Sequence, residues 1–455
     1  MKNRILNLIF ILITLVGVVV SARLLFSGRS LWLDEGMLAW SVSNRSLGTL
    51  ISKPLDLTQS APVLYLYAVK LLTLALGNSE VTLRLFSFIS YIAVIVLSYF
   101  LAERLCVKRP YAVCACVSGC GILLRYSCEF KPYMTDCAAV LGVLLLYSLY
   151  NSKKLNFAVL TAIFAIMIWL SNPACIFIAG IIIFELAKNI KKPVKTLIGG
   201  AVLALSFGIY FVFWLKPVIE NGDMTAYWEN MRFPLLINSK AELKNAFDML
   251  MLLAKPVGII SLVALFCISK IKKPEIAVTF IGFALCFVAS SLGFFPVSER
   301  IWLFAYPLLI ILAFVFFSLQ GFAEIVVSLA LILSVSGIYD YRSPESVYIE
   351  GDNLNPVVDY LKDKDEFIYV YVHSVPTYCY RMNYEVPENT MLGNGYFEEY
   401  NPDIEEIKSH NSGYIVVSHR IGRRVDGLFE ALENDFTVTE EFSDHGTILY
   451  HFQKN

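Results

Sequence analysis

Long apolar stretches recur along the first 340 residues of the chain, separated by short polar loops. A helix needs roughly 20 mostly apolar residues to cross the hydrocarbon core of a bilayer. By that rule the pattern predicts about eleven membrane-spanning helices. The expected spans are 5–26, 81–103, 110–125, 133–150, 156–171, 173–189, 196–215, 246–269, 276–295, 301–318 and 322–339.

One further apolar stretch, residues 61–77, is short and carries Lys70 near its middle. The basic residues of the loops decide how it is placed, because Lys and Arg concentrate in short cytoplasmic loops. If 61–77 lies along the membrane surface, all basic loops fall on one side. We therefore interpret it as an interfacial helix. The basic loops are Lys2/Arg4, Arg104/Lys108/Arg109, Lys153/Lys154, Lys188/Lys191/Lys192/Lys195 and Lys270/Lys272/Lys273.

This placement gives a multi-pass protein of the cell membrane with a cytoplasmic N-terminus. The outer face then holds the loop 27–80, the segment around Glu129 to Asp136, the loop 216–245, the segment 295–300 and everything after about residue 340. The C-terminal part is accordingly expected to be extracytoplasmic.

The pattern changes to that of a soluble protein after residue 340. Short strand-like runs at 367–372, 414–418 and 447–452 alternate with helix-like segments at 355–362, 403–409 and 424–433. We expect a mainly α membrane domain over 1–340, including the outer loop 27–80, and a small α/β domain over 341–455.

Composition supports a membrane setting and narrows the chemistry. Hydrophobic residues make up 57% of the chain and charged residues 16%, and the net charge of -1 gives no indication of a nucleic-acid partner. All five histidines, 373, 410, 419, 445 and 451, follow residue 340. Proton transfer in the membrane domain must therefore use other groups.

The first outer loop contains the adjacent acids Asp34 and Glu35 within Ser30-Leu31-Trp32-Leu33-Asp34-Glu35-Gly36. Acids near hydrocarbon are costly and invite a functional interpretation, although loop acids can also simply solvate a loop. Further charged residues are expected on the same face, namely Arg84, Glu129, Lys131, Asp136, Glu299 and Arg300. Interfacial anchoring or local ion pairing is the alternative explanation for each of them.

These features occur in an order that resembles the GT-C glycosyltransferases. A first span is followed by Leu33-Asp34-Glu35, by Pro62 to Tyr65, by Arg84 to Ser87, by Asp136 and by a soluble tail. The resemblance is to bacterial members related to the protein O-mannosyltransferases and the lipid A aminoarabinose transferase. It covers residues 1–340 and is strongest over 25–140. Many relatives have His-Pro-Pro where this chain has Ser60-Ala61-Pro62.

The resemblance implies a GT-C fold and the transfer of a hexosyl or pentosyl group. The donor would be a polyprenyl-phosphate sugar, and the acceptor a hydroxyl or amine of a glycan, lipid or protein outside the membrane. By match to the family motif, Asp34 is the general base of an inverting displacement. Some relatives need a divalent ion, Mg or Mn, and others do not. Asp34 and Asp136 are the residues that could hold one here.

The other candidate residues take roles from the charge that develops in such a reaction. Cations stabilise a leaving phosphate, which makes Lys131, Arg300 and Arg84 candidates for the donor phosphate. Glu35 and Asp136 could orient these cations or hold a sugar hydroxyl. Contacts to the sugar or acceptor are expected from Trp32, Tyr65, Tyr133 and Glu129. Membrane-interface belts of Trp and Tyr provide the alternative explanation for the aromatic residues.

A transporter or flippase of a lipid-linked saccharide is the alternative function, because it too would have many spans. Transporters commonly show paired repeats and binding sites at the bilayer midplane. No such pairing is visible in the sequence, and the acids lie at one surface. The C-terminal domain is expected either to recognise the acceptor or to cap the outer loops.

Overall fold

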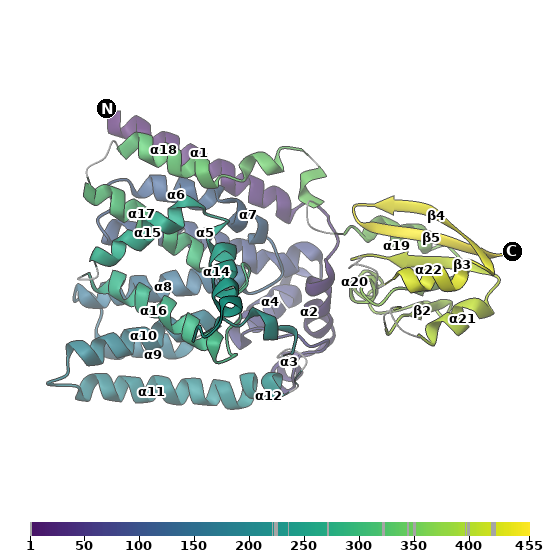
Figure 1. The fold of residues 1–455 in the computed structure, drawn as a ribbon, viewed down its shortest axis with the longest axis horizontal. Helices are drawn as coiled ribbons and strands as arrows, with labels where there is room; N and C mark the ends of the chain where they lie inside the picture. Colours follow the sequence, from purple (N-terminus) through teal and green to yellow (C-terminus); the bar gives the residue numbers. More distant parts are fainter. Residues whose placement is uncertain are drawn as a thin grey trace.

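A helical bundle and a smaller sheet domain make up the chain (Figure 1). The computed structural model describes residues 2–220, 222, 226–234, 236–270, 273–320, 324–343, 345–348, 352–395, 397, 401–419 and 425–455. Lys272, Arg424 and the first two residues of the expected span 322–339 lie outside the described residues.

Most helices of the bundle run side by side, and the N-terminus lies at the end away from the sheet domain (Figure 1). Five described helices are long and apolar enough to cross a membrane, and five apolar helices of 10–17 residues accompany them. The expectation of about eleven spans stays a prediction. The bundle comprises α1 (Lys2–Leu25), α5 (Glu80–Arg104), α6 (Pro110–Gly119), α7 (Gly121–Tyr126), α8 (Tyr133–Asn151), α9 (Phe157–Met167), α10 (Asn172–Lys188), α11 (Val194–Tyr210), α12 (Lys216–Glu220), α14 (Lys240–Ala254), α15 (Ile259–Leu265), α16 (Pro274–Ser291), α17 (Ala305–Gln320) and α18 (Glu324–Val335).

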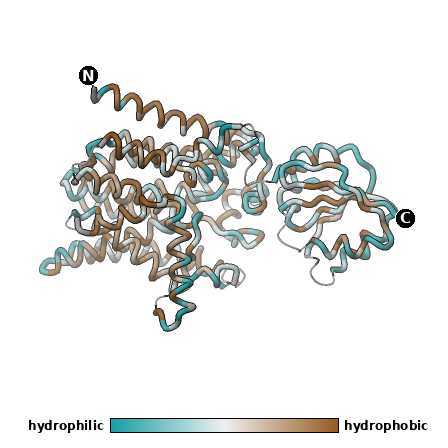
Figure 2. The backbone as a smooth tube through the Cα atoms, turned by 45° about the horizontal axis from the view of Figure 1, so that its top comes forward, coloured by the Kyte–Doolittle hydropathy of each residue, from teal (hydrophilic) through white to brown (hydrophobic). Residues whose placement is uncertain are grey.

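Hydrophobic residues predominate along the helices of the bundle, as the brown tube in Figure 2 shows. Large hydrophobic side chains point outward from helices at its periphery, among them Leu8, Phe213 and Leu333. Such a surface would be unfavourable in water and is compatible with lipid. The chain is therefore a membrane protein.

The expected single span 246–269 is not one straight helix. The structure divides it into α14 and α15, which meet at an angle of 104°. Pro256 lies in the break and cannot continue the backbone hydrogen-bond pattern of a helix. Gly258 follows with a φ of 50°, a left-handed conformation that glycine adopts readily. The sequence contained both residues, but the hydrophobic pattern alone did not reveal the bend.

The outer loop folds into three helices, α2 (Leu33–Asn44), α3 (Leu47–Ser52) and α4 (Val63–Leu76). α4 corresponds to the expected interfacial helix and has 14 residues, fewer than a perpendicular span requires. Its Lys70 is buried and donates hydrogen bonds to the carbonyl oxygens of Val42 and Ser43 at the end of α2. A cation is stabilising at that end of a helix. The loop is thus packed as a unit.

The C-terminal domain is a five-stranded sheet in the order β2-β1-β3-β5-β4. β1 pairs in parallel with β2 and β3, whereas β5 is antiparallel to β3 and β4. The expected strands and helices are present, but α20, β2 and β4 were not anticipated. β2 has only three residues, and β4 is a mostly exposed, polar strand at the sheet edge. The elements are α19 (Asn355–Leu361), β1 (Phe367–Val370), α20 (Val375–Arg381), β2 (Thr390–Leu392), α21 (Asp403–Ser409), β3 (Ser412–Val417), α22 (Asp426–Leu432), β4 (Phe436–Asp444) and β5 (Thr447–Lys454).

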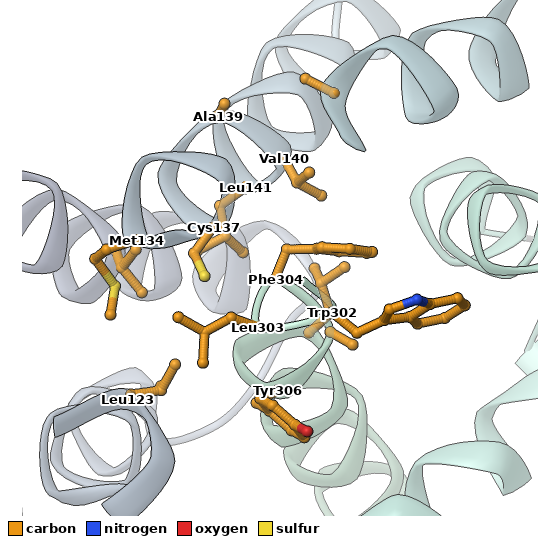
Figure 3. Close-up of a cluster of buried hydrophobic side chains, with 14 of the residues drawn as sticks. Leu123, Met134, Cys137, Ala139, Val140, Leu141, Trp302, Leu303, Phe304 and Tyr306 are labelled. Carbon is orange, nitrogen blue, oxygen red and sulfur yellow. The ribbon is translucent and has the colours of Figure 1, made fainter. Parts of the chain in front are cut away.

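A cluster of buried side chains joins α7, α8 and the segment before α17 (Figure 3). Trp302, Leu303 and Phe304 are almost fully buried in it, and only Ile301 separates them from Arg300. Dense packing of this kind leaves little room for movement. The cluster therefore fixes the segment that carries Arg300 relative to α8, the helix that carries Asp136.

Candidate functional site

The N-terminus of α2 presents Asp34 and Glu35 in its first turn. Glu35 caps the start of the helix, because its Oε2 accepts a hydrogen bond from the backbone N–H of Trp32 at 3.2 Å. Neighbouring positions on a helix point in directions about 100° apart. The two adjacent acids consequently face different surroundings.

Glu35 is fully buried and bound from several sides. Its carboxylate accepts hydrogen bonds from Arg84 Nε at 2.9 Å and Nη2 at 2.5 Å, and from the backbone N–H of Phe130 at 2.7 Å. Arg84 also donates to the carbonyl oxygens of Arg29 and Ser30. Burial by itself would raise the pKa of Glu35, but Arg84 outweighs it and the pKa lies below its ordinary value. The pair joins α2 to α5.

Asp34 points instead toward the segment before α17. Its Oδ2 accepts a hydrogen bond from Arg300 Nη1 at 2.6 Å. The side chains of Asp34 and Arg300 are 22% and 18% exposed, so this ion pair is accessible, unlike that of Glu35. The Arg300 guanidinium also lies over the Trp228 ring, at 5.4 Å from the centroid. A small ligand could therefore reach both members of the pair.

Lys131 and Glu129 lie near this pair, in the segment between α7 and α8. Lys131 is buried, and its Nζ donates to Gln59 Oε1 at 2.6 Å. Burial lowers the pKa of Lys131, partly offset by Asp34 and Glu129. Glu129 is 7% exposed, and its Oε1 has no hydrogen-bond partner among the described residues. Burial, assisted by the negative charge of Glu35, raises the pKa of Glu129 to about 8.

The remaining candidates lie farther into the bundle. Asp136 is buried in the first turn of α8. Tyr133 begins the same helix, and its ring packs edge-on against Tyr126 at 5.7 Å. Tyr65 of α4 is fully buried and stacks near Phe130 at 6.3 Å.

A pocket opens beside Arg300, which is one of its lining residues, whereas Asp34 is not. It encloses about 610 Å³ of empty space, its open mouth included. Charged and aromatic side chains from the bundle face segments that lead to the C-terminal domain. A site of this kind suits a polar, anionic or sugar-like ligand. The lining residues are Leu24, Arg29, Trp32, Arg125, Tyr126, Glu129, Arg300, Tyr341, Ser346 and Val347.

The C-terminal domain docks on the start of α2. Thr377 Oγ1 of α20 donates to the carbonyl oxygen of Leu31 at 3.0 Å, and the Trp32 ring lies 5.9 Å from that of His419. Gly36 permits this approach, because a Cβ there would lie 2.7 Å from Thr377 Oγ1. Each residue of Asp34-Glu35-Gly36 thus meets a different part of the molecule.

Sequence reasoning did not single out Gln59 or Thr377. Gln59 stands next to the segment that departs from the family pattern at Ser60-Ala61-Pro62, which was the one available signal. The contact between Thr377 and Leu31 spans a distance in the sequence that no local pattern indicates.

Among the described residues, the acidic, histidine and cysteine side chains do not form a binding site for a divalent ion. No group of three or more His, Cys, Asp or Glu side chains is arranged among these residues to hold a metal ion. Of the two acids suggested for that role, Asp34 is bound to Arg300. The arrangement of these residues therefore does not fit a metal centre.

No family model matches the sequence, and no curated protein does either. ArnT from Cupriavidus metallidurans bound to undecaprenyl phosphate matches with a TM-score of 0.60 at 12% identity, covering 97% of each chain. Its apo structure matches with the same TM-score and identity, covering 99% of this chain and 98% of ArnT. The oligosaccharyltransferase AglB from Archaeoglobus fulgidus, in complex with an inhibitory peptide and a dolichol-phosphate, matches with a TM-score of 0.51 at 12% identity, over 97% of this chain and 74% of AglB. The chain therefore shares the fold of ArnT and AglB, as the resemblance found in the sequence implies.

Proposed function

We propose that this protein transfers a sugar from a polyprenyl-phosphate donor to a hydroxyl or amine acceptor at the extracytoplasmic face. The observation that carries the proposal is the difference in burial between the adjacent acids Glu35 and Asp34. Glu35 is fully buried in its pair with Arg84, whereas Asp34 is partly exposed and paired with Arg300, which lines the pocket. The fold likeness to a protein bound to undecaprenyl phosphate supports the choice of donor.

Asp34 is the general base of the proposed reaction. The acceptor O–H or N–H gives its proton to the Asp34 carboxylate as the acceptor atom attacks the anomeric carbon of the sugar. The bond from that carbon to the phosphate oxygen breaks, and its electron pair leaves with the phosphate. Attack from the side opposite the leaving group inverts the configuration at the anomeric carbon.

Arg300 and Lys131 receive the donor phosphate in this scheme. A guanidinium binds phosphate through two donors, and a buried ammonium provides a strong point charge. In the structure Arg300 holds Asp34, so a phosphate that takes over Arg300 would release the carboxylate. Binding of the donor would thereby activate the base. Glu35 and Arg84 are proposed to hold α2 in position and not to contact the donor.

Replacing Asp34 tests the proposal directly. We expect Asp34→Asn to lower sugar transfer by roughly 10²–10⁴-fold, the usual contribution of a general base. Mass spectrometry of cell-surface glycans from cells with the wild-type or the variant protein measures the effect. A sugar missing only from the variant cells would identify the product as well.

The matched control is Asp359→Asn, which breaks an exposed carboxylate–arginine pair with Arg381 on the C-terminal domain. It should leave the glycans unchanged. Unchanged glycans in cells with correctly folded Asp34→Asn protein would refute Asp34 as the base. A lipid-linked saccharide that crosses the membrane without a new glycosidic bond would favour a flippase.

A further inference from the structure

The outer loop contains two consecutive non-glycine residues in the left-handed conformation. Leu57 has a φ of 53° and Thr58 a φ of 54°. This region is unfavourable for residues with a Cβ, and most of all for a β-branched residue such as threonine. Backbone strain of this kind persists only where surrounding contacts enforce it, and it clusters at functional sites.

The contacts that enforce the strain come from the helix that carries Asp34. Asp56 accepts hydrogen bonds from Arg45 Nη2 at 2.6 Å and from Ser41 Oγ at 2.9 Å. Ser41 belongs to α2, and Arg45 directly follows that helix. The loop 56–59 is therefore held in a fixed position relative to α2.

The strained turn delivers the side chain of Gln59 to Lys131. Gln59 Oε1 accepts the hydrogen bond from Lys131 Nζ at 2.6 Å, and Gln59 Nε2 donates to the carbonyl oxygen of Leu57 at 3.3 Å. The second bond fixes which way the amide points. Because an amide is neutral, it orients the buried ammonium without cancelling its charge.

Gln59 also lines a second pocket, between the outer loop and the C-terminal part of the continuous helix Val194–Glu220, which includes α11 and α12. Lys53, Ser60 and Trp214 line the same pocket, which encloses about 360 Å³ of empty space with its mouth. Phe213, another wall residue, is 74% exposed on the apolar surface of the bundle. A lipid that approaches from the bilayer along this wall would meet Gln59 next to Lys131.

We propose that Gln59 is a positioning residue for the donor: it holds the Lys131 ammonium in place until the lipid phosphate binds there. This inference rests on the proposed function. A phosphate makes a stronger, charge-assisted bond than an amide and would displace it. A carboxylate at position 59 would instead form a buried ion pair with Lys131 and compete with the phosphate.

Binding of undecaprenyl phosphate to the purified full chain in detergent tests the inference without requiring sugar transfer. We expect Gln59→Glu to raise its Kd by about tenfold, in line with the loss of one charge-assisted hydrogen bond. Thr58→Gly removes the strain, so it should raise the Tm of the ligand-free protein and yet raise the Kd as well. A purely structural role would not combine higher stability with weaker binding of the phosphate lipid.

The matched control is Lys153→Gly, because Lys153 also has a left-handed φ, of 59°, in the loop that follows α8. It should raise the Tm and leave the Kd unchanged. Undecaprenol, which lacks the phosphate, should not distinguish Gln59→Glu from the wild type. If the wild type binds undecaprenyl phosphate and the Gln59 and Thr58 variants bind it equally well, the inference is wrong. If the wild type does not bind it, the proposed donor is wrong.

Discussion

The adjacent acids Asp34 and Glu35 each pair with an arginine, but they differ in burial. The Glu35–Arg84 pair is fully buried, so removing one charge would leave the other without compensation in a low-dielectric interior. We expect Glu35→Gln to lower the free energy of unfolding by about 3–5 kcal/mol. Thermal or denaturant unfolding in detergent measures this loss.

Asp34→Asn provides the comparison, since its ion pair is partly exposed and water can solvate the charge that remains, so the loss should be smaller than for Glu35→Gln. Its stability should therefore stay closer to that of the wild type while transfer is lost. Equal destabilisation by the two substitutions would show that Asp34 is structural like Glu35.

Glu129 should make donor binding depend on pH. Its pKa is raised to about 8, so the carboxyl is neutral in the folded protein at pH 7 and ionises above pH 8. The new negative charge would compete with phosphate for Lys131 and Arg300. We expect the Kd for undecaprenyl phosphate to rise between pH 7 and 9, and Glu129→Gln to abolish that rise.

Glu129 should also make the stability of the folded protein depend on pH. Between its ordinary pKa of 4.5 and about 8, folded Glu129 keeps a proton that the unfolded chain releases, so its contribution to stability falls as pH rises. Glu129→Gln should remove this fall in stability.

For donor binding, a Kd that still rises between pH 7 and 9 in the Glu129→Gln variant would assign the pH dependence to another group.

Residue types at the site could be predicted from the sequence, but their pairing could not. Asp34, Arg300 and Lys131 were found because charge is rare near apolar spans. Which acid meets which cation depends on the rotation of α2 and on residues up to 266 positions apart. Gln59 was missed because a neutral amide in a polar loop carries no such signal.

At the scale of elements, α2 is held at both ends. The Glu35–Arg84 pair fixes its first turn, and Lys70 of α4 binds carbonyl oxygens at its end. The third constraint is the docking of α20 on Gly36. The hydrophobic pattern predicted where most helices of the bundle lie, since lipid-facing and core-facing positions are both apolar. It missed the division of 110–125 into α6 and α7 and of 246–269 into α14 and α15, and it could not indicate this docking.

Gly36→Ala tests that contact. The added Cβ would lie 2.7 Å from Thr377 Oγ1 and 3.0 Å from Thr377 N, so α20 or α2 must move. Overpacking of this kind costs about 1–3 kcal/mol. We expect faster proteolysis between the bundle and the C-terminal domain, and reduced transfer, because α2 also carries Asp34.

Gly48→Ala is the matched control in the neighbouring helix α3. Nothing lies within 4 Å of its added Cβ, and Ala favours helix over Gly by about 1 kcal/mol. This variant should be as stable as the wild type or slightly more so. Identical behaviour of the two variants would show that the α20 contact does not restrain α2.

At the scale of the whole molecule, the sheet domain and the N-terminus lie at opposite ends of the bundle (Figure 1). The distribution of basic loops predicts that the N-terminal end is cytoplasmic and the C-terminal domain extracytoplasmic. Cys106 is the exposed cysteine among the ten and lies in the basic loop after α5. Thr439 is exposed on β4 of the C-terminal domain. The two positions therefore report on the two predicted sides.

A membrane-impermeant maleimide distinguishes these sides in oriented vesicles. In right-side-out vesicles it should label Thr439→Cys and leave Cys106 unmodified, whereas in inside-out vesicles the pattern should reverse. Labelling of Cys106 in right-side-out vesicles would invert the topology and place Asp34 on the cytoplasmic face. That result would exclude an extracytoplasmic acceptor, because Asp34 and the C-terminal domain are joined through α2 and α20 and must lie on the same side.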